Sequence, residues 1–376
     1  MAKILVILAV VGLAISRYCR VVAQDQEEAS STPSPLLVFG DSLVDSGNNN
    51  YLDTTFRADS PPYGIDSPTG RPAGRFSNGR NMADYISEVL ELPEPPSPHL
   101  SPQFQGERLL YGANFASGGV GILNDTGSEL GNIIRMPEQL ASFERYQAQL
   151  AALVGGTEQA RRLVNRALVL LALGTEDFVR NYFTLPFSAR ARQYTPRGFI
   201  DYLISEYVKI LQRLFELGAR RVLVIGPGHI GCVPAQLAAT GRDDVVGECT
   251  SEIENAALFF NSELARVTQQ MNSQLQTDVY VAANTYMIGY NFPNNRDAYR
   301  YTEWRVACCG QGSYNGEGQC TPASNLCPNR DEYVFWDSYH PTERAIAAIL
   351  KFILDGTPEV MSPMNLNTML AVNNET

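Results

Sequence analysis

The chain of 376 residues contains few histidines and few charged side chains. It has three histidines, and Asp, Glu, Lys and Arg together make up 18% of the residues. Acidic residues outnumber basic ones by 40 to 29, which gives a net charge of −11. A nucleic-acid partner requires a basic face that neutralises phosphates, so the sequence predicts no such partner. The same acidity argues against electrostatic attachment to anionic membranes.

Two motifs that hold metals or nucleotides are also missing. The chain has no HExxH zinc motif and no Walker phosphate-binding loop. It has no Gly-x-Ser-x-Gly elbow, which argues against the α/β-hydrolase fold. We therefore expect no cofactor and no metal. Hydrophobic residues, by contrast, make up 44% of the chain, which is enough to bury a sizeable core.

The chain opens with a hydrophobic leader. Lys3 precedes an apolar run over residues 4–15, and the small residues of Val21-Val22-Ala23 follow. This pattern predicts a signal peptide over residues 1–23 and a secreted protein that starts at Gln24. The run is short for a membrane span, and no second span follows it. The alternative is an uncleaved anchor in the ER, because residues 17–20 separate the run from the cleavage site.

Seven cysteines occur, and six remain once a signal peptide removes Cys19. An even number in a secreted chain predicts disulfides. Cys308 and Cys309 are neighbours, so we expect them to pair with different partners. The zinc alternative lacks the required CxxC spacings. Asn124-Asp125-Thr126 predicts a glycosylated Asn124 in a surface loop, and residues 374–376 form a second acceptor sequence.

Aliphatic runs alternate with segments of helical periodicity. The run over residues 166–173 is the strongest strand signal, because near-continuous aliphatics are typical of a strand covered on both faces. The predicted strands are residues 36–39, 109–115, 166–173, 221–225 and 278–283, and the predicted helices are residues 81–90, 137–154, 196–217, 251–274 and 341–354. This alternation predicts a three-layer α/β/α sandwich around a mostly parallel, five-stranded sheet. We expect one domain over residues 35–360, after a polar leader (24–34) and before a C-terminal tail (361–376).

The first predicted strand runs into Gly40-Asp41-Ser42. Parallel α/β sheets build their sites at the carboxyl ends of the strands, so Ser42 is predicted to be a nucleophile. A serine nucleophile needs a base, and near neutral pH histidine is the usual one. Only His340 has a carboxylate three residues before it, Asp337. The predicted catalytic set is therefore Ser42, Asp337 and His340.

These residues also have plain structural interpretations. Serine is common in turns and at helix N-caps, and Asp337 precedes the helix predicted at 341–354, where aspartate is a preferred N-cap residue. His99 lies among prolines and is expected on a surface loop. His229 follows the strand at 221–225 and is expected to be a solvated loop residue, the alternative being an electrostatic role in the site. The catalytic candidates all lie at the carboxyl end of a predicted strand or in the loop before the last predicted helix. This shared placement favours a catalytic role over the structural interpretations.

Three sequence blocks carry a family resemblance. Val38-Phe39-Gly40-Asp41-Ser42, residues 114–121 (NFASGGVG) and Asp337-Ser338-Tyr339-His340 resemble blocks one, two and five of the plant GDSL-type esterase/lipases, a branch of the SGNH hydrolases. The resemblance extends over nearly all of residues 36–354. It implies a flavodoxin-like fold with Ser42 as nucleophile, His340 as base and Asp337 as its partner. It also implies that the N–H groups of Ser42 and of Gly121, rather than Gly119, bind the oxyanion.

The third block departs from the family pattern. The resemblance implies Gly-x-Asn-Asp, whose asparagine donates to the oxyanion, but Gly174-Thr175-Glu176-Asp177 places Glu176 there. An ionised glutamate only accepts hydrogen bonds. We expect it to repel the oxyanion unless it is protonated or turns away, and the loss of one donor alone slows such enzymes roughly 10²–10³-fold.

The sequence thus predicts a secreted esterase/lipase that hydrolyses carboxylic esters of acyl lipids or related molecules through an acyl-serine intermediate. Its expected partner is a small-molecule or lipid ester. Two alternatives stay open: a catalytically impaired protein that binds lipids or acyl ligands, and an acyltransferase in extracellular lipid polymer assembly. Glu176 motivates the first of these, and the second differs only in the acceptor of the acyl group.

Overall fold

The computed structural model describes residues 33–184, 187–240, 249–294 and 301–372. The predicted signal peptide, most of the polar leader and the acceptor sequence at 374–376 lie outside these residues. From Pro35 onward the chain forms one compact unit. In the described ranges, no helix has both the length and the apolar character that a membrane crossing requires.

A central sheet runs through the unit in the order β2-β1-β3-β4-β5-β8. Its strands are β1 (Leu36–Gly40), β2 (Gly112–Asn114), β3 (Leu168–Ala172), β4 (Arg221–Ile225), β5 (Tyr280–Ala283) and β8 (Met361–Ser362). The first five are mutually parallel, whereas β8 pairs antiparallel with β5. This is the flavodoxin-like order, in which ligands bind where the strand order reverses, between β1 and β3.

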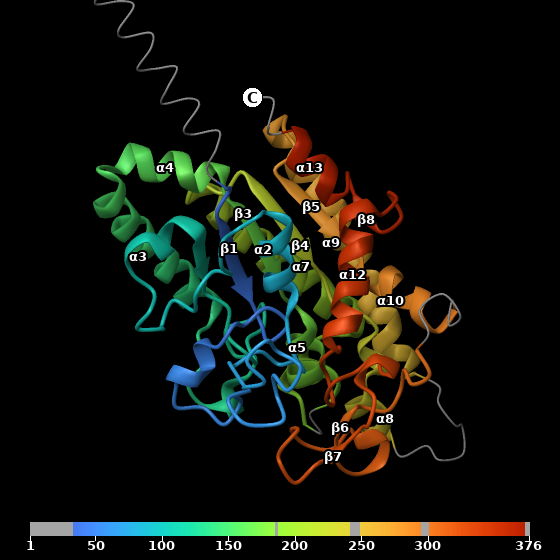
Figure 1. Ribbon diagram of the computed structural model, residues 1–376. Helices are drawn as coiled ribbons and strands as arrows, with labels where there is room; N and C mark the ends of the chain where they lie inside the picture. Colours follow the sequence, from blue (N-terminus) through green and yellow to red (C-terminus); the bar gives the residue numbers. More distant parts are fainter. Residues whose placement is uncertain (1–32, 185–186, 241–248, 295–300, 373–376) are drawn as a thin grey trace, which may run out of the picture. The chain divides into compact units, whose positions relative to one another are not determined.

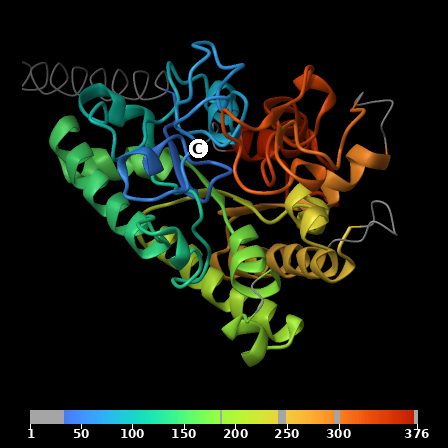
Figure 2. The same cartoon turned by 90° about the horizontal axis from the view of Figure 1, so that it is seen from below.

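Two helical layers cover the sheet (Figures 1 and 2). One layer contains α3 (Met136–Val154), α4 (Thr157–Arg166), α7 (Pro196–Glu216) and α9 (Ser251–Leu275), and the other contains α2 (Met82–Val89), α10 (Thr285–Asn294), α12 (Glu343–Asp355) and α13 (Leu366–Val372). Alternate residues of each strand face opposite layers, so that Leu37 and Phe39 contact the first layer and Leu36 and Val38 the second.

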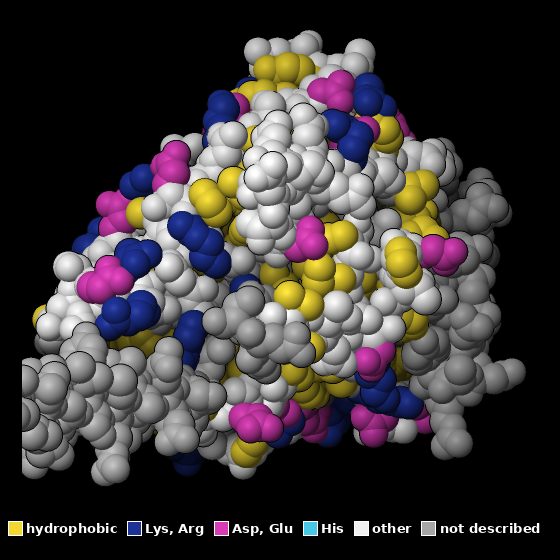
Figure 3. Space-filling model, turned by 90° about the horizontal axis from the view of Figure 1, so that it is seen from above, with side chains coloured by type: hydrophobic (Ala, Val, Ile, Leu, Met, Phe, Trp, Pro, Cys, Tyr) yellow, Lys and Arg dark blue, Asp and Glu magenta, His cyan; other side chains and the backbone are white. Residues whose placement is uncertain are grey.

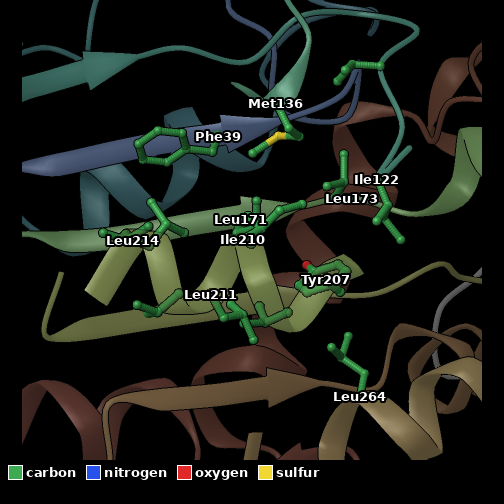
Figure 4. Close-up of a cluster of buried hydrophobic side chains, with 14 of the residues drawn as sticks. Phe39, Ile122, Met136, Leu171, Leu173, Tyr207, Ile210, Leu211, Leu214 and Leu264 are labelled. Atoms are coloured by element: carbon green, nitrogen blue, oxygen red, sulfur yellow. The ribbon is translucent and has the colours of Figure 1, made fainter. Parts of the chain in front are cut away.

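The first layer packs against the sheet through large apolar side chains (Figure 4). Phe39 of β1 and Leu171 of β3 lie in the same cluster as Leu211 and Leu214 of α7, and all four are fully buried. Burying one such side chain stabilises the fold by about 1.5–3 kcal/mol. The near-continuous aliphatic strands that the sequence predicted are explained by this double coverage.

Helix ends follow local sequence signals. The Asn81 side chain accepts a hydrogen bond from the backbone N–H of Asp84 at the start of α2, and the Asp84 carboxylate accepts one from the backbone N–H of Asn81. At the start of α7 the Thr195 side chain accepts a hydrogen bond from the backbone N–H of Gly198, and Pro196 stands in the first turn. These caps explain why the predicted starts of the long helices agree with the structure within one or two residues.

Two segments with an explicit prediction have a different structure. Residues 109–115 were expected to be a strand, but residues 106–111 form a 3-10 helix, Gly106–Tyr111, and only Gly112–Asn114 pairs with β1. Gly112 has a φ of 108°, and a Cβ there would lie 1.9 Å from the Leu36 carbonyl oxygen, so this strand begins at a glycine. Residues 361–372 were expected to be a tail, but they form β8 and α13, whose Leu366 and Met369 are buried.

Three disulfides join the six cysteines: Cys232–Cys249, Cys308–Cys327 and Cys309–Cys320. The prediction that the neighbouring cysteines have different partners is confirmed. Two of the bonds secure the small ribbon of β6 (Cys309–Gly310) and β7 (Asn325–Leu326), which lies near the carboxyl ends of the parallel strands (Figure 1). The opposite end of the molecule, seen from above, carries basic and acidic side chains interspersed with apolar ones (Figure 3).

Candidate functional site

Ser42 stands in a tight turn directly after β1. The backbone N–H groups of Val44 and Asp45 both donate to the Asp41 carbonyl, and the Leu43 N–H donates to Asp41 Oδ1 at 3.0 Å. Gly40 permits the turn because its φ is 130° and an added Cβ would lie 1.9 Å from the backbone oxygen of Ala172. The serine is therefore fixed at the carboxyl end of β1, beside β3.

A buried glutamine holds the same glycine from the other side. The Gln139 side chain, on α3, donates from Nε2 to the Gly40 carbonyl at 2.9 Å and accepts the Gly40 N–H on Oε1 at 2.9 Å. The amide thus satisfies both backbone groups of Gly40, as a neighbouring strand would. Sequence reasoning did not identify Gln139, because a single polar residue on an amphipathic helix carries no pattern.

The structure brings the three predicted catalytic residues together. Ser42 Oγ lies 2.7 Å from His340 Nε2, although the two residues are 298 positions apart in sequence. His340 Nδ1 lies 2.8 and 2.9 Å from the two carboxylate oxygens of Asp337. All three residues are buried. A carboxylate can only accept, so Nδ1 carries the proton in neutral His340 and Nε2 is left to accept from the serine hydroxyl.

Asp337 is held by three further donors. The backbone N–H groups of Tyr339 and His340 donate to Oδ1 at 2.9 and 2.8 Å, and the buried Tyr63 hydroxyl donates to Oδ2 at 2.7 Å. The loop is closed by the Trp336 N–H, which donates to the His340 carbonyl at 2.7 Å. Tyr63 is a site residue that sequence reasoning missed, because it lies 274 positions from Asp337 in a segment without periodicity.

This arrangement sets the charge of both partners. Burial alone would raise the pKa of Asp337, but His340 and the donors outweigh burial and lower it. Burial alone would lower the pKa of His340, but the Asp337 carboxylate outweighs burial and raises it above its usual value. A base with a raised pKa accepts the serine proton more readily, provided that the pH keeps it neutral beforehand.

Asp41 is a second unusual carboxyl at the site. It is buried, and Oδ2 has no hydrogen-bond partner among the described residues. Burial, followed by the charge of Glu176, raises the pKa of Asp41 to about 8. The Asp41 carboxyl is therefore neutral at pH 7 and can act as a donor there, unlike an ordinary aspartate.

A cavity of about 170 Å³ opens at Ser42 and His340. Apolar side chains from both sides of the sheet edge make up most of its wall, among them Met82, Ile225, Ile230, Val233, Trp304, Ile346 and Ile349. Polar groups are concentrated near the serine, where Asp41, Glu176 and His340 line the cavity. An apolar cleft with a few convergent polar groups is the usual form of a small-molecule site.

Glu176 lies in the cavity wall, but its charge is compensated. Glu176 belongs to the short helix α5 (Thr175–Phe178), and the π-helical turn Val179–Phe183 continues it. Arg180 Nε donates to Glu176 Oε2 at 2.6 Å. The carboxylate thus forms an ion pair with a side chain of its own helical segment. Protonation and a turned-away side chain were the two expected ways for Glu176 to avoid repelling the oxyanion, and this ion pair is a third.

The glycines of the second block are held close to α5. Asp177 accepts hydrogen bonds from the N–H groups of Ile122 and Leu123 and from the Thr126 hydroxyl, at 2.7, 3.0 and 2.7 Å. A Cβ on Gly121 would lie 2.6 Å from Asp177 Oδ1. Neither Gly119 nor Gly121 contributes to the wall of the cavity as the described residues form it, and the oxyanion role of Gly121 stays a prediction.

Of the other two histidines, His229 differs from what we expected, whereas His99 lies on a loop as predicted. His229 is not solvated: its side chain is 17% exposed, Nδ1 lies 2.5 Å from Glu254 Oε2, and the ring stacks on Tyr286 in the wall of the same cavity. His99 packs against the ring of Phe115, and burial lowers its pKa to about 4. Each of the two rings thus packs against one aromatic neighbour and is partly withdrawn from water.

Two further patterns lie around His229. Gly226, Gly228 and Gly231 have the spacing of a dinucleotide-binding loop, but the last of these glycines lies inside the 3-10 turn Ile230–Cys232, whereas that motif opens a helix directly. His229, Cys232 and Glu254 place donor atoms within 4.8 Å of one another. Because Cys232 is bonded to Cys249, its sulfur is not a thiolate, and we assign no metal to this cluster.

Comparison with known proteins identifies the family. Residues 36–353 match the family model described as GDSL-like Lipase/Acylhydrolase. The GDSL esterase/lipase LTL1 of Arabidopsis thaliana is 54% identical over 336 residues, which cover 89% of this chain and 90% of the relative. The GDSL esterase/lipase At1g33811 of the same plant is 37% identical over 349 residues, which cover 92% and 93% of the two chains. With this match over nearly the whole fold, the chain belongs to the GDSL-like lipase/acylhydrolase family.

Proposed function

We propose that the protein is a serine esterase/lipase that hydrolyses carboxylic esters of acyl lipids through an acyl-serine intermediate. The observation that carries this proposal is the continuous hydrogen-bonded chain from Ser42 through His340 to Asp337 at the mouth of an apolar cavity. Membership of a family of esterases and lipases supports the same class of reaction.

In the first half of the reaction, Ser42 Oγ attacks the ester carbonyl while its proton passes to His340 Nε2. Asp337 stabilises the imidazolium and keeps its orientation. Negative charge develops on the carbonyl oxygen. The Ser42 N–H has no hydrogen-bond partner among the described residues and is one donor for this oxygen, with the Gly121 N–H as the proposed second. His340 then protonates the leaving alcohol.

In the second half, His340 takes a proton from water, which attacks the acyl-serine, and then passes this proton to Ser42 Oγ as the bond between Oγ and the acyl carbon breaks and the acid is released. The apolar wall of the cavity is suited to the acyl chain, because moving such a chain out of water is favourable. Long acyl chains are therefore expected to bind better than acetyl groups.

The test is hydrolysis of p-nitrophenyl esters of increasing chain length by the purified mature protein. We expect turnover above that of Ser42→Ala, with KM falling as the chain lengthens. A fluorophosphonate probe should label the wild-type protein and not the Ser42→Ala variant. Equal hydrolysis by the two proteins would count decisively against the proposal.

One observation favours a second candidate, an acyl-ligand-binding protein with impaired turnover. A glutamate, rather than an oxyanion donor, lines the cavity beside Ser42. Under this alternative the protein binds fatty acids without hydrolysing esters, and Glu176→Asn stays inactive. Hydrolysis by the wild-type protein would reject it.

We further propose that the protein is secreted and glycosylated. Three disulfides support an oxidising compartment. Asn124 is exposed, as a glycan acceptor must be. Expression in a eukaryotic secretory host tests both points: we expect protein in the medium beginning at Gln24, and a mass loss on amidase treatment that Asn124→Gln abolishes. Retention in the cell with an intact N-terminus would instead indicate an ER anchor.

A further inference from the structure

Arg180 is linked to the proposed oxyanion site by its ion pair with Glu176. Glu176 is 8% exposed as a residue, and the two paired side chains are 10% and 19% exposed. In such a setting water screens charge poorly, so an unpaired carboxylate beside Ser42 would strongly disfavour a second negative charge. The Nε–Oε2 distance of 2.6 Å indicates a direct, charge-assisted hydrogen bond.

Further contacts hold the Arg180 guanidinium in addition to its ion pair with Glu176. It lies over the Phe56 ring, 4.9 Å from the centroid, and 5.9 Å from the centroid of Tyr339, the neighbour of His340. A second carboxylate, Glu129, contacts it at 3.3 Å from a side chain that is 46% exposed. Burial alone would lower the pKa of Arg180, but Glu176, Tyr339 and Glu129 outweigh burial and raise it. The positive charge thus stays in place between two aromatic rings.

We propose that Arg180 is a positioning residue that neutralises Glu176 and holds its carboxylate, so that a site with glutamate near the oxyanion can still stabilise negative charge. This inference rests on the proposed esterase function and deepens it. Arg180 does not touch the reacting atoms. It acts through Glu176, and its importance should therefore vanish when Glu176 is replaced by a neutral residue.

A double-mutant cycle tests this dependence. We expect Arg180→Gln to lower kcat for a p-nitrophenyl ester roughly 10- to 100-fold with little change in KM, because the uncompensated charge acts on the transition state. In the Glu176→Asn background, the same Arg180→Gln change should alter kcat less than about threefold. Arg180→Lys should recover part of the activity, because it retains the charge.

Glu129→Gln is the matched control. It removes the other, exposed carboxylate from the same guanidinium and should leave kcat unchanged. The loss in kcat at constant KM and its partial recovery in Arg180→Lys are readouts that a merely structural role would not produce.

The outcomes separate the two proposals. Equal losses from Arg180→Gln with glutamate or asparagine at position 176 would overturn this inference, since Arg180 would then act on its own, and the proposed function would stand. An unchanged kcat in Arg180→Gln would overturn it too. If neither the wild-type protein nor Glu176→Asn hydrolyses more than Ser42→Ala, the proposed function fails, and the role of Arg180 in it is overturned as well.

Discussion

Replacing Asp41 by asparagine should change how stability and activity depend on pH. Asp41 Oδ1 accepts the Leu43 N–H, and Oδ2 has no hydrogen-bond partner among the described residues. An asparagine side chain has the shape of a protonated aspartic acid. It can accept the same N–H on its oxygen and place its NH₂ group where the protonated Oδ2 lies. We therefore expect Asp41→Asn to fold without a cavity or a clash.

The magnitude follows from proton linkage. Burial raises the pKa of Asp41 from 3.8 to about 8 in the folded protein. Between these values the folded state keeps a proton that the unfolded state has lost. The contribution of Asp41 to stability is therefore fully present below pH 3.8 and is lost as the pH rises toward 8, by at most about 1.4 kcal/mol for each pH unit. Asparagine has no such proton, so this slope should disappear.

The assay is denaturant unfolding of both proteins at several pH values from 6 to 8. Asp45 and Asp177 also have pKa values that burial raises, to about 6, so the lower part of this window overlaps their titration, which occurs in both proteins. His340 titrates in both proteins, and its contribution cancels in the difference except for its coupling to the charge of Asp41. We expect the stability of Asp41→Asn relative to the wild type to increase steadily across the window. Parallel curves would refute the reasoning that Asp41 is neutral at pH 7.

The same variant bears on the reaction. Above pH 8 the wild-type protein gains a negative charge next to Ser42, so its kcat/KM should fall by up to roughly tenfold between pH 8 and pH 9, whereas Asp41→Asn should lack this decline. Ester hydrolysis by Ser42→Ala at each pH gives the background to subtract. A decline of equal size in both proteins would assign the alkaline limb to another group.

Three further predictions concern the residues around the triad. Tyr63→Phe removes one hydrogen-bond donor from Asp337. We expect kcat to fall several-fold with KM unchanged, and the free energy of unfolding to fall by about 1–2 kcal/mol. A normal kcat would show that the backbone donors alone hold Asp337 in place. Gly40→Ala places a Cβ 1.9 Å from the Ala172 oxygen, so we expect circular dichroism to show no folded protein. The control is Gly70→Ala, where φ is 61° and an added Cβ meets open space, and it should fold with only a small loss of stability. Similar melting curves for the two variants would contradict this prediction. Because the Asp337 carboxylate raises the pKa of His340, kcat/KM should decline with falling pH through a pKa above 6.5, and Asp337→Asn should move this acid limb to lower pH.

The parts of the fold that were predictable are those where local and global preferences agree. β4, Arg221–Ile225, has the predicted bounds because its aliphatics are covered on both faces and a glycine follows. α7 was predictable because Thr195 and Pro196 mark its start. The helix α4, Thr157–Arg166, was missed, since only Ala160 and Val164 are buried and its sequence is mostly polar.

The strand β8 could not be predicted for a different reason. Met361 and Ser362 form a two-residue strand whose existence depends on the exposed edge of β5 and not on any propensity of its own. The same holds for the start of β2 at Gly112, where the close approach of the Leu36 carbonyl requires a glycine.

The site was predictable where residues close in sequence act together. Asp337 and His340 share one short loop, so their spacing was informative. The side chains that hold this set, Tyr63 and Gln139, come from distant segments, and no sequence pattern joins them to their partners. The pairing of Glu176 with Arg180 is an i,i+4 contact that sequence could have suggested, but an ion pair on a helix is usually exposed and uninformative.

The separation of 298 residues between Ser42 and His340 has a consequence for how the activity arises during folding. The nucleophile comes from the first strand and the base from the loop before α12, so every crossover of the sheet must be in place before the two meet. A chain with such distant contacts closes its last loops late. An intermediate with the sheet formed but the C-terminal segment undocked would hold a serine without a base. Recovery of ester hydrolysis during refolding thus reports the final step, whereas far-ultraviolet circular dichroism reports earlier ones.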